Sequence, residues 1–89
     1  MNANQREQLR LSLLRFLDAN AGRRTSLALL TQYAKSEGRP ALSGDEVKAE
    51  LFYLRDKGLV AASAKVISPE NPAFDITAAG RDAYAEFQA

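Results

Sequence analysis

The segment of residues 43–60, SGDEVKAELFYLRDKGLV, constrains the fold of this 89-residue chain more than any other. Ser43 and Glu46 match the Ser-x-x-Glu capping box, in which each side chain accepts a hydrogen bond from the other residue's backbone N–H. Apolar residues then recur at helical spacing, and Gly58 is placed to end the helix because glycine adopts a positive φ without penalty. The segment predicts a helix over about residues 44–57.

Beyond this helix the apolar period changes from helical to alternating. Residues 60–67 alternate as a half-buried strand does, and residues 73–76 alternate again, with Phe74 and Ile76 expected on one face. The loop between them, residues 68–72, contains two prolines, which cannot donate to a strand ladder. These two segments predict a β-hairpin.

Two helices are predicted ahead of this region. Asn4 begins a capping-box pattern, and the leucine-rich stretch after it favours an amphipathic helix over about residues 4–20. Thr25 or Ser26 can cap a second helix, over about residues 26–37.

A last helix is predicted over about residues 78–88, with Thr77 as its cap. Gly80 lies inside it, at a cost of about 1 kcal/mol relative to alanine, and a close packing contact would explain its presence. The predicted order is therefore α-α-α-β-β-α: a mainly α protein with a small β-hairpin, of the α+β class, in a single domain over residues 1–89.

The composition excludes several kinds of chemistry. Without cysteine or histidine the chain has no disulfide, no thiolate site and no imidazole base or metal ligand. No catalytic constellation or phosphate-binding loop is recognisable, so we expect no enzyme, no cofactor and no metal. The polar start has no signal-peptide pattern, and no apolar run is long enough to span a membrane, which predicts a cytoplasmic protein.

Two motifs resemble the winged helix-turn-helix superfamily. Residues 54–60, LRDKGLV, are similar to the helix exit L-x-x-K-G-L-V of MarR-, ArsR- and PadR-type regulators. Residues 74–81, FDITAAGR, are similar to their wing exit Y-x-L-T-x-x-G-R. The size and the short last helix also resemble small winged-helix proteins of Mu-like prophages. The resemblance implies a winged helix that binds double-stranded DNA, with helix 44–57 in the major groove.

The resemblance also implies where DNA would be contacted, and there the charges depart from the family pattern. The matching helix positions are Gly44, Asp45, Glu46, Lys48, Ala49 and Phe52, and those of the wing tip are residues 68–72. Only one of these helix residues is basic, and the wing tip has no lysine or arginine, whereas DNA affinity depends largely on such cations. Asp45 and Glu46 have a simpler explanation, because acids in the first turn complement the helix dipole.

The cations are concentrated in the first half of the chain. Residues 1–42 hold seven bases and three acids, net +4, whereas residues 43–89 hold five bases and eight acids, net −3. Arg6 and Arg10 lie one turn apart, and an arginine pair precedes the second helix, whose N-terminus suits a phosphate. Three interpretations of these arginines are open: they face DNA, they bind an acidic protein, or they are solvated surface residues without a partner. The candidate DNA-binding residues are Arg23, Arg24, Arg39, Lys48, Arg55 and Lys65.

Aromatic residues supply the alternative. Phe52 and Tyr53 are adjacent, so they cannot both face one core and one of them should be partly exposed. With Tyr84 and Phe87 on the last helix they are candidate interface residues, for a homodimer through that helix or for a protein partner. The leading hypothesis is a small DNA-binding protein, a transcriptional regulator of prophage origin. The alternative is a winged-helix interaction or assembly module that does not bind DNA.

Overall fold

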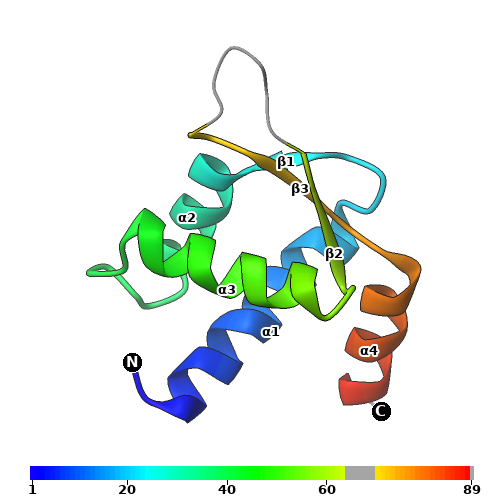
Figure 1. The fold of residues 1–89 in the computed structure, drawn as a ribbon. Helices are drawn as coiled ribbons and strands as arrows, with labels where there is room; N and C mark the ends of the chain where they lie inside the picture. Colours follow the sequence, from blue (N-terminus) through cyan, green and yellow to red (C-terminus); the bar gives the residue numbers. More distant parts are fainter. Residues whose placement is uncertain (64–69, 89) are drawn as a thin grey trace.

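The computed structural model describes residues 1–63 and 70–88 (Figure 1). Its elements are α1 (Ala3–Ala19), β1 (Thr25–Ser26), α2 (Leu27–Ser36), α3 (Gly44–Asp56), β2 (Val60–Ser63), β3 (Ala73–Ile76) and α4 (Ala78–Gln88). This is the predicted α-α-α-β-β-α order with one short strand added. No described helix is both long and apolar enough to cross a membrane.

The first and third helices form the centre of the molecule. Leu9, Leu13 and Leu17 lie one or two turns apart on α1 and are fully buried, as are Val47 and Leu51 on α3. In Figure 1 α3 crosses in front of α1, the hairpin rises behind α3, and α4 lies beside the lower end of β2. One core cluster therefore holds α3 against both α1 and the sheet.

The helix caps confirm two predictions and correct a third. Ser43 and Glu46 form the predicted capping box of α3, and Ser26 caps α2. The predicted cap of α1 at Asn4 is wrong, because Asn2 caps the helix through a reciprocal box with Gln5. Both Asn2 and Asn4 are followed three residues later by Gln or Glu, as the capping box requires. The cap at Asn2 lets the helix begin at Ala3.

The sheet has three antiparallel strands in the order β1-β3-β2. In the predicted hairpin, Val60 pairs with Ile76, and the strand expected over residues 60–67 is seen as far as Ser63; its remainder lies outside the described residues. Phe74 and Ile76 are both buried, as expected for one face. The unpredicted β1 pairs along β3, with Thr25 opposite Phe74, and closes the sheet on the far side from α3.

The two sequence motifs that resemble winged-helix regulators are in direct contact. Thr77 caps α4, and its hydroxyl donates to the Gly58 carbonyl at 2.7 Å while accepting from the Gly80 N–H at 3.0 Å. The Thr77 N–H donates to the Leu59 carbonyl at 3.1 Å. A Cβ at Gly80 would lie 2.0 Å from that same Leu59 oxygen. The expected close contact at Gly80 is thus confirmed, and it seats α4 against the exit of α3.

Candidate nucleic-acid interface

The acidic start of α3 is partly occupied by its own cap. Glu46 accepts from the backbone N–H of Ser43 at 3.0 Å and from its hydroxyl at 3.1 Å. These hydrogen bonds favour the carboxylate, and they lower the pKa of Glu46 from its ordinary value. Glu46 therefore serves the helix terminus, as the dipole argument predicted.

The next acid on α3 is neutralised from α1. Glu50 is 7% exposed, and its Oε1 lies 2.6 Å from Nε of Arg10. The guanidinium of Arg10 also stacks over the Tyr53 ring, 3.8 Å from its centroid. Arg10, which the sequence suggested as part of a basic patch with Arg6, is thus committed to holding α1 and α3 together.

Two cations and an aromatic ring gather on the side of α3 nearest the sheet. Arg55 Cζ lies 4.3 Å and Lys48 Nζ 5.5 Å from the centroid of the Phe52 ring. That ring packs in turn against Phe74 of β3, with centroids 6.2 Å apart. We call Lys48, Phe52 and Arg55 the α3 cation–aromatic cluster. Because its ring rests on the core, the cluster holds two cations in place beside the wing hairpin.

The other aromatic residue of α3 is exposed. Tyr53 is 41% exposed, whereas Phe52 is half-buried. This confirms the prediction that one of the two adjacent rings is partly exposed. Lys57 Nζ lies 5.6 Å from the Tyr53 centroid, so this ring also carries two cations, Arg10 and Lys57. Lys57 was not among the predicted DNA-binding residues, although it is the lysine of the K-G-L-V motif and could have been chosen on that ground.

The carboxylates of α3 are mostly committed elsewhere. Glu46 is bonded within the cap, Glu50 is paired with Arg10, and Asp56 accepts from Arg55 at 3.1 Å. Among the described residues only Asp45 of the four α3 acids has no hydrogen-bonded or ionic partner. Of these acids only Glu50 is neutralised by a mostly buried cation, because the hydrogen bonds of Glu46 leave its negative charge in place and the Asp56 pair is exposed.

The start of α2 is not the phosphate site that its neighbouring arginines suggested. The first N–H groups of a helix can bind an anion only if they are free. Here the N–H of Leu27 donates to the Pro72 carbonyl at 2.8 Å, and that of Ala28 to Asn71 Oδ1 at 3.0 Å. The third, that of Leu29, donates to the Ser26 hydroxyl at 3.2 Å. This corrects the prediction, and it identifies Asn71, which the resemblance placed at the wing tip, as the link between the wing and α2.

Three of the predicted DNA-binding arginines and lysines lie away from the cluster or outside the described residues. Arg23 and Arg24 are exposed in the turn before β1, which is the edge strand opposite the one that α3 contacts. Lys65 lies outside the described residues. The structure therefore brings Lys48 and Arg55 together and does not join Arg23 or Arg24 to them.

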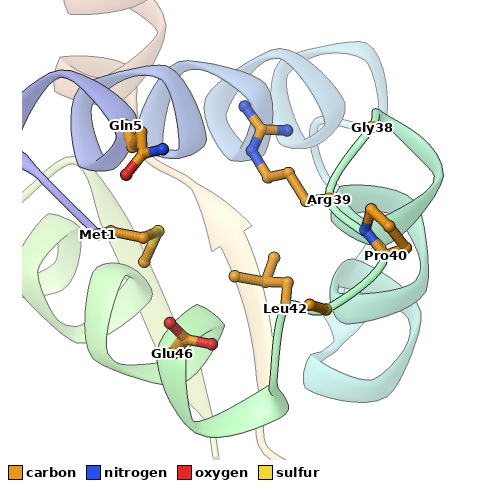
Figure 2. A pocket seen from close by; sticks show the side chains of 8 residues that line it. Met1, Gln5, Gly38, Arg39, Pro40, Leu42 and Glu46 are labelled. Atoms are coloured by element: carbon orange, nitrogen blue, oxygen red, sulfur yellow. The ribbon is translucent and has the colours of Figure 1, made fainter.

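Arg39 points inward rather than toward solvent. It lies in the α2–α3 loop, it is half-buried, and its Nη1 is buried without a hydrogen-bond partner among the described residues. Figure 2 shows its side chain extending from the loop toward α1. Arg39 therefore does not extend an exposed basic patch, which corrects its predicted place beside the flanking arginines.

The two aromatic residues of α4 have different environments. Tyr84 is 7% exposed and belongs to the core, so its ring is not presented to a partner, contrary to the sequence-based expectation. Phe87 is 57% exposed, and it borders a hollow between α4 and α1 that Leu11 and Arg15 also line. Only Phe87 of this pair remains available as an interface residue.

Comparison with known proteins supports the fold. No protein-family model matches the sequence, and no curated protein matches it either. Among solved structures, the transcriptional regulator BldR from Sulfolobus solfataricus is similar, with a TM-score of 0.64 and 22% sequence identity over 89% of this chain. The chain spans 50% of the length of that protein. The architecture is that of a winged helix-turn-helix, with α2 and α3 as its helical pair and β2 and β3 as the strands of its wing.

Proposed function

We propose that this protein is a small DNA-binding winged-helix protein that acts as a transcriptional regulator, with α3 entering the major groove. The observation that carries the proposal is the α3 cation–aromatic cluster, in which Phe52 holds Lys48 and Arg55 beside the wing hairpin. The similar fold of a transcriptional regulator supports it. A cytoplasmic location follows from the proposed role.

The mechanism that we propose separates positioning from affinity. The Arg10–Glu50 pair and the core fix α3 relative to α1, while Lys48 and Arg55 meet phosphates or base edges on the exposed side. Arg55 can leave Asp56 and bind a phosphate, because their ion pair is exposed to water and therefore weak. Arg23 and Arg24 are retained as contacts to more distant phosphates, because both are exposed and no ion pair with a described residue engages them.

A direct test is fluorescence anisotropy of a labelled mixed-sequence duplex, titrated with the full chain at about 50 mM salt, where even non-specific DNA binders retain affinity. The proposal expects saturable binding that weakens linearly on a log–log plot as salt is raised. Absence of binding at that salt concentration would refute it and leave the alternative function.

That alternative, a protein-interaction or assembly module, is favoured by one observation. Phe87 is the most exposed of the large apolar side chains among the described residues, and it borders the hollow between α1 and α4. A second copy of the chain, meeting this one through α4, is the partner that the sequence predicted. Sedimentation velocity at about 100 µM, where a weak interface of small area would be populated, tests it. A shift from dimer to monomer on Phe87→Ser would support an α4 homodimer, and a monomeric wild-type chain would remove the homodimer. A prophage origin stays a prediction from sequence.

A further inference from the structure

The outermost ridge of α3 is formed by side chains that lie three or four residues apart. This spacing places them along one side of a helix, and none of them is buried. They are Asp45, Ala49, Phe52 and Asp56. Leu51 and the other apolar α3 residues of the core lie on the opposite side. In a DNA groove this ridge is the part of α3 that lies deepest, and Lys48 and Arg55 lie along one flank of it.

Asp45 is the first polar residue of this ridge. It is exposed, and it is the one acid of α3 that has no hydrogen-bonded or ionic partner among the described residues. It is also the second residue of α3, and the N-terminal residues of a recognition helix are those that contact base edges. Ala49, one turn further along, carries only a methyl group and does not hold α3 away from the bases. The ridge therefore presents a free carboxylate to the floor of the groove.

A free carboxylate restricts the base that it can contact. It accepts hydrogen bonds and donates none, so it needs an amino group on the base. In the major groove only cytosine N4 and adenine N6 carry one, whereas guanine N7 and O6 and thymine O4 are acceptors that repel a carboxylate. The adenine amino group lies between two such acceptors, its own N7 and O4 of the paired thymine, but the cytosine amino group has an acceptor on one side only. Cytosine is therefore the base that suits Asp45 best.

We propose that Asp45 selects cytosine at one position of the DNA site by accepting a hydrogen bond from its N4 amino group. This inference rests on the proposed function and adds base selection to it. Lys48 and Arg55 supply the attraction to the phosphate backbone, while Asp45 weakens binding wherever no amino group compensates for its charge. The acidic start of α3 thus lowers the affinity for most sequences and increases the discrimination between them.

The test uses a pool of duplexes whose central helical turn, about 10 base pairs, is randomised. The full wild-type chain and its Asp45→Asn variant each select duplexes from the pool, and the bound DNA is sequenced. The wild type should enrich a motif with cytosine at one position. The variant should enrich the same motif with adenine there, because an asparagine amide donates to adenine N7 and accepts from its N6 amino group. On single duplexes that differ only at that base pair, each protein should prefer its own base at least about fivefold.

Two further variants separate base selection from charge and from helix stability. Asp45→Ala should lose the preference at that position and bind mixed-sequence duplex more tightly, because a repulsive charge is removed. Asp82→Asn removes the same charge from an exposed position of α4 and should select the wild-type motif. If Asp45 served only the helix dipole, Asp45→Asn would lower the thermal midpoint slightly and keep the wild-type base preference. That outcome would overturn the proposal.

The same selection distinguishes failure of this inference from failure of the proposed function. A wild type that binds duplex DNA, but enriches no cytosine at a position that Asp45→Asn alters, overturns the cytosine contact and leaves DNA binding intact. A wild type that binds no duplex at about 50 mM salt refutes the proposed function, and the cytosine contact with it. A switch from cytosine to adenine at a single position, with the rest of the motif retained, supports both.

Discussion

Nε of Arg10 lies 2.6 Å from Oε1 of Glu50, and this ion pair joins the middle of α1 to the middle of α3. Glu50 is nearly buried, and the Arg10 guanidinium is also stacked over the exposed ring of Tyr53. One arginine thus neutralises a buried acid and orders an aromatic residue on the outer surface of the same helix. We infer that this pair fixes how α3 is presented to a partner.

Replacing Arg10 should therefore destabilise the fold. Arg10→Met keeps most of the aliphatic stem but leaves the Glu50 carboxylate nearly buried and unpaired, which should lower the free energy of unfolding by about 2 kcal/mol. Urea denaturation measures this change. The double variant Arg10→Met/Glu50→Leu should recover most of the loss, since an apolar pair replaces the ionic one. Arg6→Met, on an exposed part of α1, is the matched control, and an equal effect in both single variants would contradict the role of the pair.

Gly80→Ala should destabilise the protein although alanine is the better helix former. At an exposed helical site this change would stabilise by about 1 kcal/mol, but here the new Cβ would lie 2.0 Å from the backbone oxygen of Leu59. Relieving that overlap requires α4 to move off the exit of α3, at a net cost of about 1–3 kcal/mol. Thermal unfolding followed by circular dichroism measures it. Ala85→Gly, at an exposed position of α4, should cost about 1 kcal/mol, and a more stable Gly80→Ala variant would contradict the packing argument.

Asn71→Ala should loosen the junction between the wing and α2. The change removes the acceptor for the Ala28 N–H, a bond of 3.0 Å, and should lower the free energy of unfolding by about 1 kcal/mol. Hydrogen exchange of the Ala28 amide should accelerate more than that of other α2 amides. Asn71→Asp retains an acceptor and should preserve protection, and Glu70→Ala is the neighbouring exposed control. An unchanged Ala28 exchange rate in Asn71→Ala would show that this bond does not hold the two elements together.

The cap of α3 should make stability depend on pH in the acid range. Hydrogen bonds from the backbone and hydroxyl of Ser43 lower the pKa of Glu46 below its ordinary value of 4.5. A carboxyl with a lowered folded-state pKa contributes stability that is present above its unfolded value and is lost as pH falls through the folded value. Urea midpoints measured from neutral pH downward should therefore converge between the wild type and Glu46→Gln below pH 4.5. Glutamine retains the box without titrating, so midpoint curves that stay parallel through this range would contradict the assignment.

Local sequence signals predicted most of the fold. The Ser43–Glu46 box, the Gly58 stop and the change of period after it predicted the bounds of α3 to within a residue and the start of β2 at Val60. Gly80 was recognisable as a packing position because glycine in a helix otherwise lowers stability. The two-residue β1 was missed, since a strand that short has no period of its own and forms only by pairing with β3.

The site was harder to predict, because it depends on contacts between distant elements. Arg10 and Glu50 are 40 residues apart, so the sequence around either residue does not indicate that the two charges neutralise each other. Arg39 lies in a loop where the direction of a side chain is set by tertiary packing, and it points inward. The burial of Tyr84 did have a signal, since it lies one turn beyond Gly80 on the same face of α4.

The claim that α3 carries DNA binding is tested most directly by the salt dependence of duplex affinity. The variant Lys48→Gln/Arg55→Gln should bind at least tenfold more weakly than the wild type, and its log–log salt slope should fall by up to about two, because each phosphate contact contributes about 0.9. Arg15→Gln/Arg81→Gln removes the same charge from the α1 and α4 side of the molecule and should leave the slope nearly unchanged. If the Lys48/Arg55 variant retains wild-type affinity and slope, α3 is not the DNA-binding element.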